Sequence, residues 1–433
     1  MSHTPPFLLP VRSTHTLIPG PTKLQACLTC SPCHLPPPDT SRHTMPIADI
    51  PRIPEERKQL PPGNFQTDLR FHRFRTHRRE WKHVSASRQY SDAMHVGQLP
   101  YGFKVISWNL RFTDNFPDLR LESALEHLQK VLSTAAKGGK GDEEDEDEVD
   151  DDDDRYGPEG TTNMMKKTAN TENELSEDVV DMAKKLDWAK DRTWGKAGRA
   201  PPPCVILLQE VHARAIKSLL GFRWVRKYFY VTPKDQEKFA HGTCFASVNL
   251  VSKQLRTGVS RVLEFNRASC QERSALMTEV LVGIRGPPGI ATLRIVNVHL
   301  ESNDDGLGMR RDQVGLVRKM VTDCRKGEVA PYGVIVAGAF NAGAAGDKPM
   351  ILEHGLQDAW IGDDDDPKAH TWGYQGGPKV SEKPGRIDRI TFVPSRGVAV
   401  LPPERIGVGL RRDWDIEKWV SDHYGIMSEV RMI

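Results

Sequence analysis

The sequence predicts an α/β layered fold, because short buried strands are interspersed with helices. Apolar runs of strand length, such as Val205–Glu210 and Val334–Asn341, are separated by segments with helical spacing, such as Arg310–Cys324. Polar side chains, among them Asn109 and His299, stand at the ends of the apolar runs. Ligands in layered α/β folds bind where strand ends converge, so the same pattern indicates where a site lies.

The chain length and the net charge leave several classes of protein open. The 433 residues are enough for two or three average domains, or for one large domain with appendages. The formal charge is only +2, but a basic stretch at Arg70–Lys82 contrasts with an acidic run at Asp142–Asp154. Such opposed blocks are typical of electrostatic interaction tails, and equally of solvated disordered runs.

Cysteine use and hydropathy favour an intracellular protein, nuclear or cytoplasmic. The seven cysteines are an odd number and form no disulfide framework. Cys27, Cys30 and Cys33 match a haem-attachment or zinc pattern, but no second ligand pair accompanies them, so we expect no metal there. No apolar run approaches the roughly 18 residues of a membrane helix. No secretory signal is visible, and we expect a monomer.

The first part of the chain is predicted to be a disordered tail over residues 1–99, rich in Pro, His and Arg. A domain then follows over residues 100–433, opening with a strand at Phe103–Asn109 and a helix that carries Leu121 and Leu132. Residues 135–173 form a low-complexity acidic insert within it, after which helical spacing resumes at Leu175–Leu186.

The remaining elements follow in order from Val205. A strand over Val205–Glu210 ends on a carboxylate, and a helix follows over His212–Leu220. The later strands and one helix are expected at Phe245–Val251, Leu276–Ile284, Leu293–Ser302, Arg310–Cys324 (helix), Val334–Asn341 and Ile387–Val393. An acid–histidine pair, Asp422 and His423, precedes the last strand.

Seven polar residues at these strand ends suit metal-assisted hydrolysis of a phosphodiester. They are Asn109, Glu210, His299, Asn341, Asp388, Asp422 and His423. Glu210 is a hard oxygen ligand for Mg²⁺ or Mn²⁺, and such an ion polarises a phosphoryl oxygen. Histidines and amides donate hydrogen bonds to the non-bridging oxygens. Asp388 is placed to hold His423 in one tautomer and to raise its pKa.

The order of the short motifs resembles the endonuclease/exonuclease/phosphatase superfamily from about Tyr101 to Ile433. The motifs are Ser-Trp-Asn109, Leu-Gln-Glu210, Asn-Val-His299-Leu, Gly-Ala339-Phe-Asn341, Ile-Asp388-Arg and Ser-Asp422-His423. The resemblance implies a deoxyribonuclease-like four-layer fold, a sandwich of two sheets flanked by helices, with a Mg²⁺ (or Mn²⁺) cofactor. The motif wording is most similar to that of 5′-tyrosyl-DNA phosphodiesterases.

The resemblance also implies a role for each residue. Glu210 would ligate the metal, with Asn109 and Asp422 assisting directly or through water. His299 would bind the phosphate and Asn341 would position the attacking water. Asp388 would support His423.

The sequence departs from the family pattern at one position. The motif Gly-Asp-x-Asn has Ala339 in place of the aspartate that aligns or deprotonates the attacking water. Loss of a positioned general base typically costs roughly 10²–10⁴-fold in rate. The sequence therefore leaves three functions open: an impaired hydrolase acting on nucleic acid or another phosphodiester, a catalytically silent binding module, and a hydrolase of phospholipid or inositol phosphate.

Overall fold

The computed structural model describes most of the chain beyond residue 64. The described residues are 65–95, 99–111, 116–134, 194–285, 289–302, 304–325, 328, 330–343, 346–376, 383–412 and 415–433. The cysteine cluster at 27–33, the acidic insert at 135–173 and the helical segment at 175–186 lie outside them.

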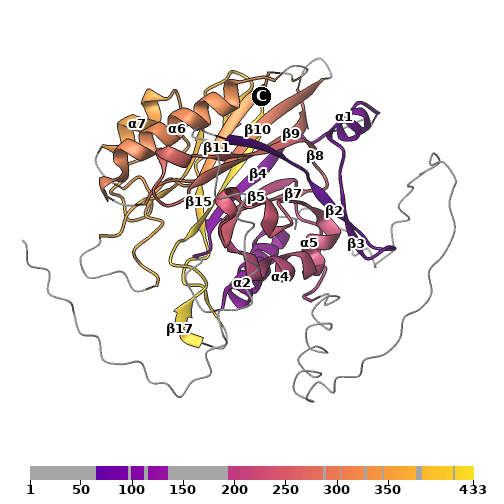
Figure 1. Ribbon diagram of the computed structural model, residues 1–433, viewed down its shortest axis with the longest axis horizontal. Helices are drawn as coiled ribbons and strands as arrows, with labels where there is room; N and C mark the ends of the chain where they lie inside the picture. The colour runs from indigo at the N-terminus through magenta and orange to yellow at the C-terminus, as the bar shows by residue number, and fades with distance from the viewer. Residues whose placement is uncertain are drawn as a thin grey trace, which may run out of the picture. The chain divides into compact units, whose positions relative to one another are not determined.

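Two mixed β-sheets form the centre of the described part (Figure 1). The first sheet has the order β1-β8-β9-β10-β11-β13-β12. Its strands are β1 (Phe65–Leu69), β8 (Arg256–Glu264), β9 (Ser274–Gly283), β10 (Ile290–His299), β11 (Gly333–Ala339), β12 (Gln357–Asp358) and β13 (Asp388–Phe392). Only the β10–β11 pair in this sheet is parallel.

The second sheet has the order β14-β18-β4-β5-β7-β6-β2-β3, with β15 also paired to β18. Its strands are β2 (His72–Arg75), β3 (Glu80–His83), β4 (Gly102–Asn109), β5 (Cys204–His212), β6 (Phe229–Thr232), β7 (Phe245–Ser252), β14 (Val398–Val400), β15 (Glu404–Ile406) and β18 (Gly425–Met432). A separate pair joins β16 (Arg411–Arg412) to β17 (Asp415–Trp419). In this second sheet β4 and β5 run parallel.

Alternate residues of the central strands enter two different cores. Phe103 and Val105 of β4 join Leu293 and Ile335 of the opposite sheet in the core between the sheets. Trp108 of β4 instead points outward, into a core shared with helices. Strands buried on both faces read as continuous apolar runs, and for this reason the sequence identified them.

Helices cover the outer face of each sheet. Figure 1 shows α6 (Leu307–Thr322) and α7 (Asp347–Glu353) beside β10 and β11. The helices α2 (Pro117–Thr134), α4 (Ile216–Gly221) and α5 (Arg223–Tyr228) pack on the sheet that contains β4 and β5. The two-sheet sandwich flanked by helices is therefore confirmed. Within the described residues, no helix has the length and apolar character needed to span a membrane.

The folded part of the chain begins earlier than the expected boundary at residue 100. The strands β1, β2 and β3 and the helix α1 (Ala86–His95) all lie within the segment 1–99 that was expected to be a disordered tail. β1 pairs with β8 over five residues, and β2 joins β6 through His72 and Val231. The expectation was wrong for 65–95 because short edge strands are held by backbone hydrogen bonds and need little apolar periodicity.

Candidate active site

The candidate residues gather at one end of the two sheets, on the faces that point toward each other. The register pairs His299 with Ala339 across β10 and β11, and Ala339 with Asp388 across β11 and β13. Directly opposed residues of neighbouring strands point to the same face, so these three side chains share a face. Asn109 ends β4 in the other sheet, in phase with the inward-facing Val105.

An irregularity in β5 directs Glu210 into this space. The pairing of β5 with β7 shifts register between Leu208 and Val211, which marks a bulge, and Glu210 has φ of 57°. A non-glycine residue in this left-handed region is strained, and such strain concentrates at functional sites. The Asn109 Nδ2 donates to Glu210 Oε1 at 3.2 Å, and His299 Nε2 lies 3.4 Å from the same oxygen.

His299 is a buried, neutral imidazole. Burial lowers its pKa well below the ordinary value of 6.5, and the positive charges of Arg273 and His423 lower it further. The Arg273 guanidinium lies 3.0 Å from His299 Nδ1, and arginine can only donate. His299 therefore carries its proton on Nε2, the nitrogen that faces Glu210.

His423, in contrast to the neutral His299, carries a positive charge. Burial lowers its pKa, but the charge and hydrogen bond of Asp388 outweigh this, and Asp422 and Glu210 add to the increase, so that the pKa rises to about 9. The Asp388 Oδ2 lies 2.8 Å from His423 Nδ1. The expected Asp388–His423 pair is thus present, with an imidazolium at neutral pH.

The backbone around His423, just before β18, is tied to the end of the neighbouring strand β4. Its N–H donates to Ser421 Oγ at 3.0 Å, and its carbonyl accepts from Trp108 Nε1 at 3.1 Å. Ser421 Oγ in turn donates to the carbonyl of Asn109 at 2.6 Å. These bonds fix the imidazole relative to the end of β4, as a preorganised site requires.

Below the site, a buried polar network joins the two sheets. Asn297 Nδ2 donates to Asn249 Oδ1 at 2.8 Å, and Gln209 Nε2 donates to Asn297 Oδ1 at 2.7 Å and to Ser107 Oγ at 3.1 Å. Gln209 directly precedes Glu210 on β5, and Asn297 lies two residues before His299 on β10. A buried network of this kind fixes the spacing of the two sheets at the rim where the candidate residues meet.

Two further predicted residues lie in the same region with other contacts. Asn341 has φ of 51°, and its Nδ2 donates to the Leu300 carbonyl at 2.7 Å, so this amide ties the end of β11 to the end of β10. Asp422 Oδ2 lies 3.6 Å from Arg111 Nε. Asp422 directly precedes His423, and its negative charge helps to raise the pKa of that imidazole.

The donor set fits a hard divalent cation that keeps several of its waters. Within the described ranges, no group of three or more His, Cys, Asp or Glu side chains is arranged to hold a metal ion. Mg²⁺ needs fewer, because it binds through one or two carboxylates and retains water. Asp422 Oδ1 and Asp388 Oδ1 are both buried without a hydrogen-bond partner, which is the state expected of acceptors that await a ligand or its waters.

Sequence reasoning missed Arg273. It is 8% exposed and contacts His299. Burial lowers the pKa of its guanidinium, and the negative charges of Glu210 and Glu301 oppose this effect. It directly precedes β9, and the antiparallel pairing of Ser274 with His299 brings it to the site. No motif surrounds it, so only the pairing of β9 with β10 reveals its place.

Neither a protein-family model nor a curated protein matches the chain, whereas solved structures do. Truncated Caenorhabditis elegans TDP2 is 17% identical with a TM-score of 0.45, over 76% of this chain and 98% of that chain. Humanized D. rerio TDP2 is 16% identical with a TM-score of 0.47, over 77% and 100%. The human Nocturnin catalytic domain is 12% identical with a TM-score of 0.41, over 78% and 96%. Such similarities concern the fold alone, and function depends on the site.

Proposed function

We propose that this chain is a divalent-metal-dependent phosphodiester hydrolase that acts on nucleic acid, as a nuclease or in the manner of a tyrosyl-DNA phosphodiesterase. The observation that carries the proposal is the meeting of a neutral His299 and a cationic His423 around Glu210. Two groups whose environments drive their pKa values apart are typical of an acid–base site. Both imidazoles would donate a hydrogen bond to a bound phosphoryl group.

In this proposal Glu210 would hold the ion, assisted by Asn109 and by Asp422. When bound, Mg²⁺ or Mn²⁺ supplies neutralisation of charge on a phosphoryl oxygen. The imidazolium of His423 donates a hydrogen bond to a non-bridging oxygen, and Asp388 keeps it protonated and oriented. His299 supplies a second donor through Nε2. Asn341 positions the loop beside β10 and offers its side-chain oxygen to the attacking water.

Ala339 makes the proposed hydrolase slow. It is fully buried and lies between His299 and Asp388 in the strand register, so a methyl group stands where the family motif has a carboxylate. The nearest carboxylate in register is that of Asp388, whose Oδ2 is already engaged by His423. Without a dedicated base, we expect a rate roughly 10²–10⁴-fold below that of a complete site.

The test is a substrate panel with Mg²⁺ or with EDTA. The panel contains single-stranded DNA, RNA, a 5′-tyrosyl oligonucleotide, sphingomyelin and inositol polyphosphates. We expect slow, EDTA-sensitive cleavage of a nucleic-acid substrate, reduced at least about 10²-fold in Glu210→Gln. Glu272→Gln is the matched control, because Glu272 also has a positive φ of 55° but is exposed. Equal activity of Glu210→Gln and the unchanged chain would contradict the proposal.

A second candidate function is a catalytically silent module that binds phosphodiesters. Ala339 is the observation that favours it, because binding by His299 and His423 needs no general base. It predicts a gel shift with no product after prolonged incubation, whereas multiple turnovers by the unchanged chain would exclude it. Release of phosphocholine or inorganic phosphate in the panel would instead indicate a lipid or inositol phosphate substrate.

A further inference from the structure

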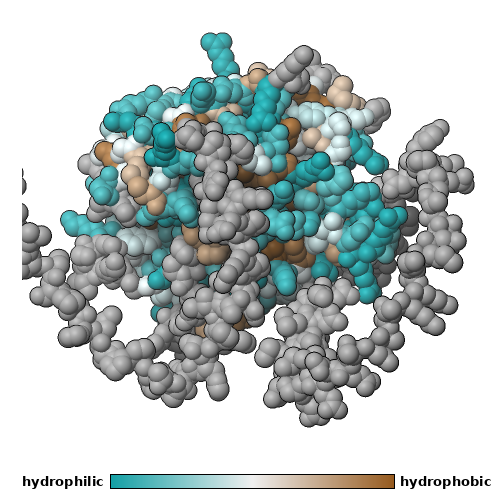
Figure 2. All heavy atoms as spheres, in the orientation of Figure 1, coloured by the Kyte–Doolittle hydropathy of each residue, from teal (hydrophilic) through white to brown (hydrophobic). Residues whose placement is uncertain are grey.

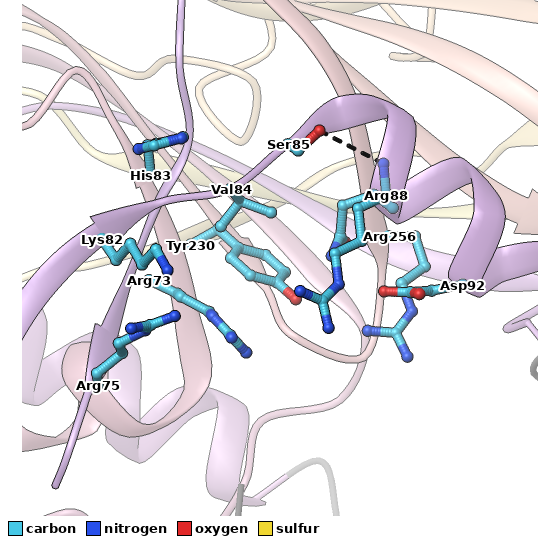
Figure 3. A pocket seen from close by; sticks show the side chains of 11 residues that line it. Arg73, Arg75, Lys82, His83, Val84, Ser85, Arg88, Asp92, Tyr230 and Arg256 are labelled. Carbon is cyan, nitrogen blue, oxygen red and sulfur yellow. Dashed lines mark hydrogen bonds between the residues drawn. The ribbon is translucent and has the colours of Figure 1, made fainter. Parts of the chain in front are cut away.

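A basic hollow of about 400 Å³ lies at the sheet edge formed by β2 and β3 (Figure 3). Side chains from β2, β3, α1, β6 and β8 line it. Arg73, Arg88 and Arg256 surround the ring of Tyr230 in Figure 3, each from a different element. Hydrophilic side chains also gather over the surface that β2 and β3 occupy (Figure 2).

The hollow lies far from the candidate active site. Arg256, in the hollow, pairs with Leu281, and Leu281 pairs with Thr292 of β10. Thr292 and His299 stand at opposite ends of β10, seven residues apart. At about 3.3 Å per residue this is roughly 23 Å along the strand, so the hollow is distinct from the site around His299.

Positive charge dominates the hollow. Its described lining includes five basic side chains, namely Arg73, Arg75, Lys82, Arg88 and Arg256, and a single carboxylate, Asp92. A neighbouring hollow shares Arg75, Lys82 and His83 and adds Arg78 and Lys234, with Glu80 as its carboxylate. Arg75 is 3% exposed and lies 4.0 Å from Glu80, whereas Arg88 is exposed at the first turns of α1.

Side chains of the β2–β3 hairpin line both hollows. Cations that are spread over several elements in adjoining hollows match a series of phosphates along a chain. A compact anion would need them to converge on one point. Each phosphate neutralised by Arg or Lys releases condensed counterions, and this favours a polymer over a single phosphate group.

We infer that this surface, defined by Arg73, Lys82, Arg88 and Arg256 and here called the hairpin surface, binds the phosphate backbone of nucleic acid at a second site. The choice of nucleic acid as ligand rests on the proposed function. The separation of about 23 Å corresponds to about seven phosphates at 3.4 Å each. The hairpin surface therefore strengthens binding of long strands and leaves short ones unaffected.

The test measures fluorescence anisotropy of labelled 4-nucleotide and 20-nucleotide DNA strands in EDTA, so that no hydrolysis intervenes. The variant Lys82→Gln/Arg88→Gln/Arg256→Gln removes three cations from the hairpin surface. The matched control Arg318→Gln/Lys319→Gln/Arg396→Gln removes two arginines and one lysine elsewhere, with the same change in net charge. The single variant Arg88→Gln changes only an exposed side chain, so it retains the fold.

We expect the triple variant to bind the 20-nucleotide strand at least tenfold more weakly at 100 mM salt, and the control to stay within twofold. Each lost contact makes the negative slope of log K against log salt shallower by about 0.7. The slope of the triple variant should therefore be shallower by about 2. Arg88→Gln alone should weaken binding about threefold. Equal losses in the variant and the control, or no loss in either, would overturn the inference.

One further measurement identifies the ligand, and another distinguishes a failure of the proposed function from a failure of the hairpin surface. If inorganic tripolyphosphate displaces the strand at equal phosphate concentration and the two strand lengths bind alike, nucleic acid is the wrong ligand. Hydrolysis of bis(p-nitrophenyl) phosphate with Mg²⁺ tests the distant site alone, and the triple variant should match the unchanged chain. Lack of hydrolysis with intact, cation-dependent binding would refute only the proposed function. Intact hydrolysis with unaffected binding would refute only the hairpin surface.

Discussion

Single residues carry the chemistry of the candidate site, and their charge states follow from their neighbours. His299 is kept neutral by burial and Arg273, whereas His423 is kept charged by Asp388. The sequence predicted the Asp388–His423 pair because both residues stand beside strand ends. The sequence could not predict that Arg273 lies at the site, because the position of Arg273 depends on which strand pairs with β10.

His72 provides a residue-scale test of stability against pH. Burial lowers its pKa to about 4, and Lys234 adds to the effect, so the folded chain holds His72 neutral. Below about pH 6.5 the unfolded chain binds a proton that the folded chain does not. Stability therefore falls between pH 6.5 and 4. We expect His72→Gln to remove this contribution, on the order of 1 kcal/mol after allowance for partial exposure.

Urea unfolding at pH 7.5 and pH 4.5 measures this contribution. The matched control is His77→Gln, which changes an exposed histidine of the same hairpin. The midpoint of His72→Gln should fall less on acidification than those of the unchanged chain and the control. If all three midpoints fall equally, His72 is not held neutral by the fold.

At the scale of elements, the sequence predicted strands that are buried on both faces and missed strands at the edges. The strands β4, β5, β10 and β11 fall within a few residues of the expected ranges. The hairpin of β2 and β3 escaped prediction because its exposed and half-buried residues show no clean alternation. Edge strands are held by backbone hydrogen bonds, which require no pattern of apolar side chains.

The early elements should be needed for stability. A chain that begins at residue 100 loses β1, β2, β3 and α1, and with them the burial of Ala93 and Leu99 against Leu281. Loss of this apolar contact should cost at least about 2 kcal/mol, and the exposed edge of β8 should promote aggregation. A chain that begins at residue 60 keeps these elements. Urea unfolding should give it the stability of the full chain. Equal stability of all three chains would show that β1, β2, β3 and α1 are dispensable.

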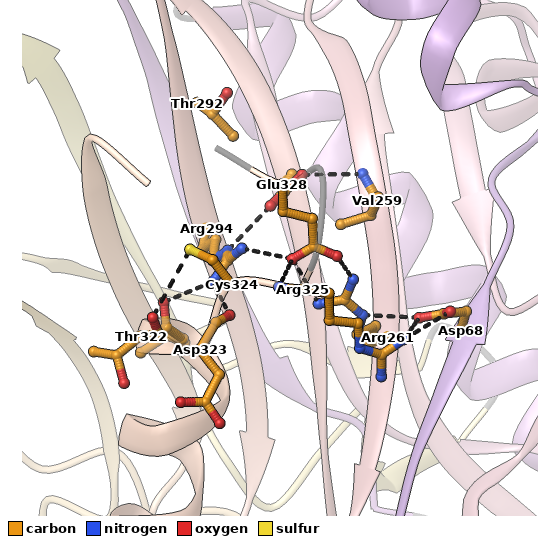
Figure 4. A network of polar contacts seen from close by, with 12 residues as sticks. Asp68, Val259, Arg261, Thr292, Arg294, Thr322, Asp323, Cys324, Arg325 and Glu328 are labelled. Carbon is orange, nitrogen blue, oxygen red and sulfur yellow. Dashed lines mark hydrogen bonds and ion pairs between the residues drawn. The ribbon is translucent and has the colours of Figure 1, made fainter. Parts of the chain in front are cut away.

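At the scale of the whole molecule, an ion network ties the β1 edge of the sandwich to its centre (Figure 4). Glu328 pairs with Arg261 of β8 and with Arg294 of β10, and Arg261 also pairs with Asp68 of β1 at 2.8 Å. The side chains of Arg261 and Arg294 are 3% and 0% exposed. Removal of one partner from such a network leaves a buried charge uncompensated, and this destabilises the fold.

Glu328→Gln should therefore destabilise the protein by about 2 kcal/mol, because Arg294 keeps Glu279 while Arg261 keeps only Asp68. The control is Glu353→Gln, which removes an ion pair with Arg311 in which both side chains are 48% exposed. That change should cost less than about 0.5 kcal/mol. Equal free energies of unfolding for the two variants would mean that the network contributes no more than a surface pair.

The sandwich as a whole was predictable because the motifs fall at strand ends in a consistent order. The inward-facing network of Gln209 and Asn297, which sets the spacing of the sheets beneath the site, was not predictable. Polar residues inside an apolar run look like interruptions until the facing sheet is known. The same applies to Ala339, whose position between His299 and Asp388 emerges only from the strand register.

The most direct test of the assembled site restores the missing carboxylate. Ala339→Asp should raise Mg²⁺-dependent hydrolysis of a nucleic-acid phosphodiester by about 10²–10⁴-fold, and EDTA should abolish the gain. Ala339→Asn, which has the same shape without a base, should give no comparable increase. If Ala339→Asp is folded and hydrolyses no DNA, RNA or 5′-tyrosyl oligonucleotide faster than the unchanged chain, the residues around Glu210 and His423 do not form a hydrolytic centre.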